Sequence, residues 1–303
     1  MSTDPKNQHY LPRFYLKGFS NPDVSGLFYV YKKGGSHWMK RGVKNIASQD
    51  YLHSFRDTTG MMRHEIEIMF SQLEANFSPV LGKVLAEQTL NHEEEFTFSC
   101  FLMTTWQRVP EQVTHLNNFV SGMGQDLLEV SYRLYTQNPE ALELVKAEYK
   151  RETGKDDIYS MKPEDLNPSK LRIEANRNMT LTVMIEEAIS LSEIIQQMGW
   201  AFLKSDSPNY FITSDSPFCL VNPDNNKTIY KNGLAYHDAE ISMPLSRNIA
   251  FFAGWKMNGR RWLRASESVV EKINCRTACL ASRELIAPKC VFPGLEKVLA
   301  KFS

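Results

Sequence analysis

The sequence lacks the features that mark a membrane-spanning or secreted chain. Its 303 residues contain no run of about eighteen apolar residues, so we expect no helix that crosses a membrane. The N-terminus has no basic stretch followed by an apolar core, so we expect no secretory signal. Cysteine is scarce, and an odd total of five favours free thiols in a reducing compartment over a disulfide framework. The expected location is therefore cytoplasmic.

An excess of charge of either sign is also missing. Lysine and arginine total 35 residues, and aspartate and glutamate total 35, so the formal net charge is zero. This balance excludes a broadly basic surface that grips duplex DNA nonspecifically, but it leaves room for a local basic groove. Hydrophobic residues make up 42% of the chain and charged residues 23%, which is typical of a folded soluble protein.

Several enzyme signatures are absent. The chain has no Gly-x-x-x-x-Gly-Lys-Ser/Thr loop, no Gly-x-Gly-x-x-Gly, no Gly-x-Ser-x-Gly elbow, no His-Glu-x-x-His and no kinase set. Cys275 and Cys279 share a face of an expected helix, but no second pair of ligands accompanies them. We therefore expect these two thiols to be buried core residues rather than zinc ligands.

The hydrophobic periodicity predicts a single α+β domain in three parts. Residues 1–60 carry strands at 26–32 and 51–55, and the N-terminal segment is expected to join the same small sheet. Residues 61–198 are expected to form the helical core, with helices from about 62, at 93–110, 110–136, 139–152 and 170–198, and a polar connection at 153–170. Asn91 is expected to cap the helix that begins near 93. Residues 199–303 are expected to form strands at 200–204, 210–213, 228–230, 240–243 and 248–252, followed by helices at 266–283 and 293–302. We expect a central bundle of long helices packed against short antiparallel strands from the N- and C-terminal parts.

The first twenty residues combine large apolar side chains with two chargeable ones. A free N-terminus is usually polar and loose, so this composition predicts a segment docked into the fold. His9 has the chemistry of a general acid, base or ligand, although a structural histidine bonded to a backbone carbonyl is the more common case. Arg13 is a cation in an apolar setting and is suited to hold phosphate or carboxylate.

The helical core carries three further chargeable residues. Arg108 lies just before the helix break at Pro110, where a guanidinium can bind an anion or form an internal ion pair with Glu67 or Glu74. Glu67 and Glu74 are seven residues apart and lie close to one helical face. Paired carboxylates at this spacing can hold a divalent metal, but more often they form a solvated stripe.

The run Ile212–Pro217 ends an expected strand with Asp215 between two serines, Ser214 and Ser216. A carboxylate at the end of a strand is a common way to present a base or a metal ligand. The same residues also build ordinary turns, because Asp and Ser bond nearby backbone N–H groups. The Met243–Ser246 run looks like a second strand exit of this kind.

These segments together resemble one protein family, the mainly bacterial domain-of-unknown-function family 4238. The resemblance rests on the following elements, in chain order: His9-Tyr10-x-Pro12-Arg13-Phe14-Tyr15-Leu16-x-x-Phe19, Glu67 with Glu74, Arg108-Val109-Pro110, Phe211-Ile212-Thr213-Ser214-Asp215-Ser216-Pro217 and Pro244-Leu245-Ser246. Val109 stands where the family has threonine, and Ser216 where it has asparagine. The resemblance implies a soluble intracellular protein, bacterial or linked to phage, without an assigned reaction.

The polar residues of these motifs come from separate segments, as expected when several elements converge on a site. The first hypothesis is a nuclease, phosphodiesterase or nucleotide-acting enzyme in bacterial or phage defence that uses Mg²⁺ or Mn²⁺. Its roles would be catalysis by His9 and Asp215, substrate binding by Arg13, Arg108 and Ser214, and metal binding by Glu67, Glu74 and Asp215. The second hypothesis is a non-catalytic binding or sensor module for an anionic ligand or a protein partner. The third is that these residues form buried ion pairs that fix the termini on the helices.

Overall fold

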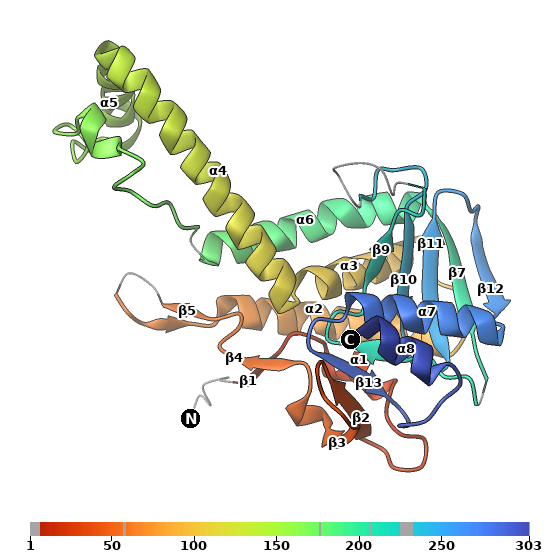
Figure 1. Cartoon of the computed structure of the whole chain (residues 1–303). Coiled ribbons are helices and arrows are strands. Elements are labelled where there is room, and N and C mark those ends of the chain that lie inside the picture. The colour runs from red at the N-terminus through yellow and green to blue at the C-terminus, as the bar shows by residue number, and fades with distance from the viewer. Residues whose placement is uncertain (1–6, 57–58, 176, 207, 225–232, 303) are drawn as a thin grey trace. The chain divides into compact units, whose positions relative to one another are not determined.

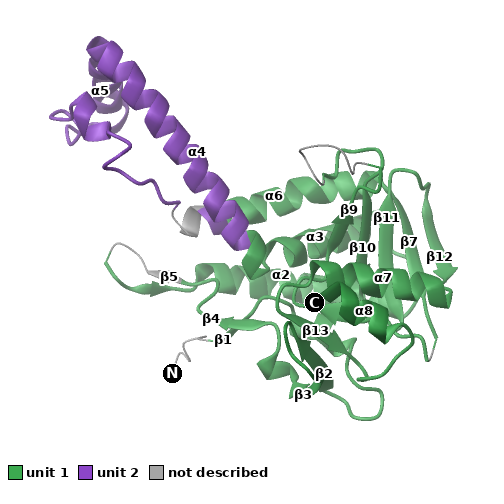
Figure 2. Cartoon of the chain, in the orientation of Figure 1, with its two compact units in different colours: residues 1–112, 182–303 green, residues 113–181 purple. Residues whose placement is uncertain are grey.

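The computed structural model describes residues 7–56, 59–175, 177–206, 208–224 and 233–302 (Figure 1). Within it the chain divides into two compact units (Figure 2). Unit 1 comprises residues 1–112 and 182–303, and unit 2 comprises residues 113–181. The fold is α+β, as the periodicity predicts, while the assignment of the chain to a single domain stays a prediction.

Unit 1 is built around a five-stranded sheet in the order β12-β7-β11-β10-β9. Its strands are β7 (Gly199–Lys204), β9 (Cys219–Val221), β10 (Glu240–Pro244), β11 (Ile249–Gly254) and β12 (Arg260–Arg264). All neighbours are antiparallel except β12 and β7, which are parallel. Strands β7 and β11 read as nearly continuous apolar runs because both of their faces are buried.

Helices cover both faces of this sheet. Trp200, Phe202 and Phe251 point to one face and pack against Phe98 of α3 (His92–Gln107), with ring centroids 5.4–5.8 Å from it. The alternate residues of the same strands pack on the other face with α7 (Glu267–Leu280), which lies across the strands in Figure 1. Unit 1 also contains α1 (Arg13–Lys17), η1 (Val43–Asn45), α2 (Glu65–Leu85), most of α6 (Arg177–Gln197) and α8 (Leu295–Phe302).

A second sheet joins the two ends of the chain. Its order is β3-β2-β13-β8, with β2 (Leu27–Lys32), β3 (Met39–Gly42), β8 (Thr213–Ser214) and β13 (Glu284–Ala287). All of its pairs are antiparallel. The expectation that both parts of the chain supply antiparallel strands is therefore confirmed. Two small two-stranded sheets pair β1 (Asn7–His9) with β4 (Ser48–Asp50), and β5 (Phe55–Arg56) with β6 (Met62–Arg63).

Unit 2 contains most of α4 (Pro110–Gln137), together with α5 (Pro139–Thr153) and the short helix η2 (Pro163–Leu166). Leu128 of α4 and Leu142 of α5 are among its buried apolar residues. The helix break at Pro110 is confirmed, since α3 ends at Gln107 and α4 begins at the proline. The predicted cap of α3 is confirmed as well, because the Asn91 side chain accepts from the Glu94 N–H.

Several predicted elements are wrong in position. Residues 171–175 are not helical, because the Gln125 and Ser121 side chains of α4 bind their backbone groups and replace helical hydrogen bonds. Residues 51–53 form a turn rather than a strand, with Tyr51 in the left-handed region at φ 53°. The N-terminal segment pairs with β4 and does not join the sheet of β2.

The last part of the chain needs further corrections. Residues 210–212 are irregular, and only Thr213 and Ser214 pair as a strand. The expected helix at 266–283 ends at Leu280, and the next residues form β13. Cys279 is exposed and Cys275 is half-buried, so the expectation of two buried thiols is wrong. The strand expected at 228–230 lies outside the described residues.

Candidate functional site

The N-terminal segment is docked, as its composition predicts. Tyr15, Leu16 and Phe19 are fully buried. The Tyr15 hydroxyl donates to the Pro244 carbonyl at 2.9 Å and bonds the Thr213 hydroxyl at 2.6 Å. Three motifs that are far apart in the sequence therefore meet at one side chain.

Arg108 lies at the centre of a first group of polar residues, which we call the Arg108 cluster: His9, His53, Glu67, Glu74 and Arg108. The guanidinium is buried, with its side chain 3% exposed, and pairs with Glu74 at 2.7 Å. It also donates to the backbone carbonyl of His9 and lies 4.6 Å from the centre of the Phe70 ring. Arg108 thus holds β1 against α2, which is the internal ion pair that the sequence left open as an alternative.

Glu67 has a different partner in the same cluster. Its carboxylate accepts from His53 Nδ1 at 2.9 Å. Burial alone would raise the pKa of Glu67, but the hydrogen bond and charge of His53, with the charges of Arg108 and His9, hold it below its ordinary value. The His53 backbone N–H donates in turn to the Gln8 side chain at 2.6 Å. Glu67 is therefore a charged and partnered carboxylate.

His9 is held in place by a backbone contact. Its Nε2 donates to the Val43 carbonyl at 3.0 Å, since a carbonyl can only accept. Burial lowers the pKa of His9, and the charges of Arg13 and Arg108 lower it further. Arg13, the first residue of α1, is exposed and forms no ion pair within the described residues.

Asp215 belongs to a second group, which we call the Asp215 cluster: Tyr10, Glu111, Asp215, Arg283 and Glu284. Asp215 is 1% exposed, and its carboxyl accepts from the Ser282 N–H at 3.1 Å. Burial and the charge of Glu111 raise its pKa to about 6. This carboxyl therefore changes its protonation state close to neutral pH, unlike that of Glu67.

Two further groups of the Asp215 cluster, Glu284 and Tyr10, also have raised pKa values. Burial raises the pKa of Glu284, although the Ala47 N–H donates to it at 3.1 Å. Burial and the charges of Asp215 and Glu284 raise the pKa of Tyr10 well above its ordinary range. One carboxylate oxygen of Glu111 is buried without a hydrogen-bond partner among the described residues, while the other lies 3.5 Å from Arg283.

The two serines next to these motifs have turn-building roles. Ser214 is fully buried, and its hydroxyl accepts from the Ser216 N–H at 3.1 Å. The Ser246 hydroxyl likewise accepts from the Asn248 and Ile249 N–H groups. The turn interpretation therefore fits both residues, and the substrate-binding role of Ser214 stays a prediction.

The structure thus brings Arg13, Arg108 and Glu74 within electrostatic range of His9, and Arg108 and His9 within electrostatic range of Glu67. It gives Asp215 other charged neighbours. Consecutive residues link the clusters, because His9 faces the first and Tyr10 the second. Among the described residues, no three His, Cys, Asp or Glu side chains are grouped so that they could hold a metal ion. Glu67, Glu74 and Asp215 do not fit the expected metal site, since each has a separate set of partners.

The sequence interpretation did not single out Tyr10, His53, Glu111, Arg283 or Glu284. Two of these had a positional signal, because Tyr10 follows His9 directly and Glu111 comes directly after Arg108-Val109-Pro110. Arg283 and Glu284 had none, since they lie where a helix is expected to end. Only the pairing of β13 with β8 brings Glu284 beside Asp215.

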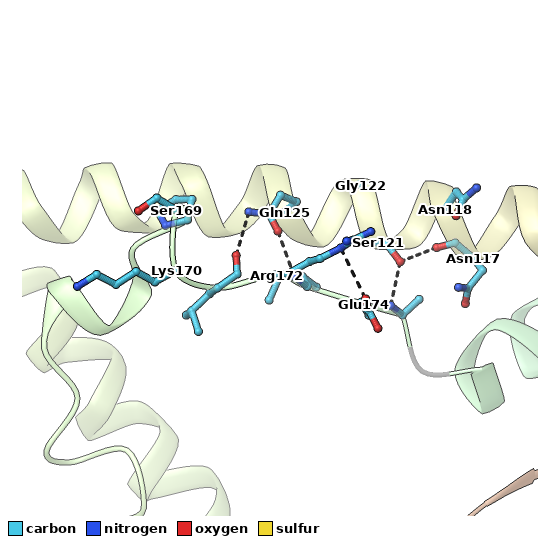
Figure 3. Close-up of a pocket in the computed structure, with 13 residues that line it drawn as sticks. Asn117, Asn118, Ser121, Gly122, Gln125, Ser169, Lys170, Arg172 and Glu174 are labelled. Carbon is cyan, nitrogen blue, oxygen red and sulfur yellow. Dashed lines mark hydrogen bonds and ion pairs between the residues drawn. The ribbon is translucent and has the colours of Figure 1, made fainter.

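Figure 3 shows a polar pocket of about 750 Å³ in unit 2, between α4 and residues 168–175. Gln125 bonds the backbone of Leu171 and Ile173, and Ser121 accepts from the Ala175 N–H at 2.9 Å. The side chains that line this pocket therefore fasten an extended segment to α4. A second cavity of about 690 Å³ in unit 1 is mostly apolar and is lined by α2, α3 and α6.

Comparison with known proteins gives one result. No curated protein and no solved structure matches this chain. In the part of the chain that the structure describes, no helix is long and apolar enough to cross a membrane. A family model described as a protein of unknown function, DUF4238, matches residues 7–289, a range that contains all the motif residues and both clusters. The chain therefore belongs to the DUF4238 family.

Proposed function

We propose that this chain is an enzyme that acts on a phosphodiester or a nucleotide by proton transfer, with Asp215 as the acid–base group. One observation carries the proposal. Asp215 is a buried carboxyl with a pKa of about 6, next to the end of a strand and beside a second carboxylate, Glu111. A group that titrates near neutral pH can both give and take a proton there, and such groups concentrate at active sites.

The choice of substrate class rests on Arg13. It is an exposed guanidinium beside His9, with no ion-pair partner among the described residues. Guanidinium groups bind phosphate oxygens through two parallel hydrogen bonds. Arg108, by contrast, is buried, and its two terminal nitrogens bind Glu74 and the His9 carbonyl, so the proposal gives it a positioning role. His9 is an imidazole fixed by the Val43 carbonyl, with a lowered pKa, within electrostatic range of Arg13.

The proposal contains no metal-dependent step. Among the described residues no three His, Cys, Asp or Glu side chains are grouped to hold Mg²⁺ or Mn²⁺, and Glu67, Glu74 and Asp215 each bind a different partner. The proposal includes a cytoplasmic location, supported by the five free thiols. A role in phage defence stays a prediction from the family resemblance.

A second candidate is a non-catalytic module that binds an anionic ligand or a protein partner. One observation favours it. The charged groups of the Arg108 cluster pair with one another, whereas Arg13 is an exposed cation without an ion-pair partner among the described residues. Such an arrangement recognises an anion without a second reactive group aimed at it.

One experiment separates the two candidates. The full chain is incubated with RNA, single- and double-stranded DNA and nucleotides, with Mg²⁺, with Mn²⁺ and with chelator, and products are resolved by chromatography. We expect product formation with a pH dependence centred near 6, and a loss of at least about a hundredfold in Asp215→Asn. The matched control is Asp238→Asn, which changes a buried carboxylate that accepts from the Asp224 N–H at 2.8 Å, apart from both clusters.

The other outcomes also distinguish between the two candidates. Product that disappears with chelator would contradict the metal-free form of the proposal. Thermal stabilisation by one of these compounds without product, lost in Arg13→Ala, would favour the binding module. Neither product nor stabilisation with any compound would overturn both candidates.

A further inference from the structure

Helix α4 carries a stripe of large apolar side chains that face solvent. Each of them is about half exposed or more: Met123 50%, Leu127 64%, Val130 62% and Leu134 49%. Phe119, 59% exposed, extends the stripe toward the N-terminus. Single exposed apolar residues are ordinary, but a contiguous row of them marks an interaction surface.

The opposite side of α4 is already occupied within unit 2. Leu128 is buried, Ser121 and Gln125 bind residues 171–175, and a Cβ added at Gly124 would lie 2.5 Å from the Ile173 side chain. The helix is thus held in its helical form by contacts that leave the stripe uncovered. A partner that binds the stripe does not need to order α4 first, and this removes a large cost of association.

The spacing of the stripe is that of a coiled coil. Leu116, Val120, Met123, Leu127, Val130 and Leu134 follow one another at alternating intervals of four and three residues. This is the heptad pattern in which alternate apolar positions form a continuous seam against a second helix. A helix that merely packs on a globular core shows a wider stripe.

Charge selects the orientation of the second helix. Asp126 and Arg133 occupy equivalent flanking positions one heptad apart. If a second α4 runs antiparallel, with Leu127 opposite Val130 of the partner subunit and Met123 opposite Leu134 of the partner subunit, then Asp126 lies beside Arg133 of the partner subunit. The two-fold symmetry makes this pair twice. In a parallel pair these positions face uncharged Ser131 and Asn138 of the partner subunit, so no complementarity arises.

We propose that two copies of this chain associate through an antiparallel pairing of their α4 helices along this stripe. The charge complementarity of the helix with itself identifies the occupant as a second copy rather than an unrelated helix. Arg133 also pairs with Glu129 of its own helix at 3.4 Å, but both side chains are exposed and such a pair is weak. The inference is independent of the proposed enzymatic activity.

The test is the mass of the full chain in solution, measured by sedimentation over a range of concentrations. We expect a dimer, and we expect Leu127→Glu to abolish it, because the substitution places a carboxylate in the apolar seam on both sides. Leu144→Glu is the matched control, since Leu144 lies on α5, off the stripe, and is 73% exposed. Far-UV circular dichroism should be unchanged in both variants.

A charge exchange tests the orientation. Asp126→Arg and Arg133→Asp each place like charges together twice and should weaken the dimer roughly tenfold. The combination of both substitutions restores the opposite charges and should recover most of the affinity. A wild-type monomer at every concentration, or a dimer indifferent to Leu127→Glu, would overturn the proposal. A dimer indifferent to both single charge changes would overturn its antiparallel arrangement.

Discussion

The Arg108 cluster and the Asp215 cluster contain consecutive residues of the N-terminal segment, His9 and Tyr10. The pKa of Glu67 in the first cluster is lowered, whereas the pKa of Asp215 in the second is raised. Glu67 and Glu74 each lie within 3 Å of a cationic or imidazole nitrogen. The Asp215 carboxyl accepts from the backbone N–H groups of Ser282 and Glu284 and has the carboxylates of Glu111 and Glu284 as charged neighbours. The pKa of a carboxyl is thus lowered at Glu67 and raised at Asp215, and the neighbours of each side chain decide the direction.

The two clusters should therefore respond to pH in opposite directions. The lowered pKa of Glu67 contributes stability that is present above its unfolded value of 4.5 and is lost as the pH falls through the folded pKa. The raised pKa of Asp215 contributes stability that is present below its unfolded value of 3.8 and is lost as the pH rises through about 6. The cost of keeping Asp215 charged in the fold at high pH is on the order of 3 kcal/mol.

The substitution with the largest expected effect on stability removes the central cation of the Arg108 cluster. Arg108→Met keeps the apolar stem but leaves the Glu74 carboxylate and the His9 carbonyl without their donor. We expect the free energy of unfolding at pH 7 to fall by about 3–5 kcal/mol, measured by urea denaturation. The double variant Arg108→Met with Glu74→Leu should recover part of this loss, because it removes the unpaired carboxylate. A loss below about 1 kcal/mol in the single variant would contradict the central role of Arg108.

A second substitution tests whether removing a carboxylate from the Asp215 cluster raises the free energy of unfolding at high pH. Asp215→Asn keeps an oxygen that accepts from the Ser282 N–H but removes the charge beside Glu111. We expect the free energy of unfolding at pH 8 to rise by about 1–3 kcal/mol, and to be nearly unchanged at pH 4, where the native carboxyl is protonated. Asp238→Asn should instead lose stability at pH 8, because hydrogen bonds from Asn222 and Asp224 outweigh burial and hold the pKa of Asp238 low. Destabilisation by Asp215→Asn at pH 8 would show that its carboxylate is stabilised.

The substitution with the smallest expected effect removes one negative charge from the Arg108 cluster. Glu67→Gln keeps a hydrogen-bonding oxygen near His53 but loses the charge. We expect a loss of about 1–2 kcal/mol at pH 7 that disappears as the pH falls below 4.5, measured by denaturation across pH. The exposed pair of Arg264 and Asp206, 2.8 Å apart, serves as a reference, and Asp206→Asn should change stability by less than about 0.5 kcal/mol. An equal loss at acid and neutral pH would assign the effect of Glu67→Gln to packing instead of charge.

The sequence predicted the elements whose signals are local. The capping residue Asn91, the helix break at Pro110 and the apolar face of α3 depend on neighbours within one or two turns, and the structure has each of them. Prediction from the sequence failed where a group distant in the chain replaced a local hydrogen bond. Residues 171–175 are extended because α4 binds their backbone, and β13 exists because β2 and β8 lie on either side of it.

The candidate site divides in the same way. The sequence alone identified four chargeable side chains in apolar or turn-forming surroundings, His9, Arg13, Arg108 and Asp215. Tertiary structure alone decided their partners. Arg108 is held in an ion pair because α2 brings Glu74 to it, and the pKa of Asp215 is raised because the fold buries it and brings Glu111 and Glu284 close to it. The physical reason is that protonation depends on burial and on charges a few ångströms away, and residues far apart in the sequence supply both.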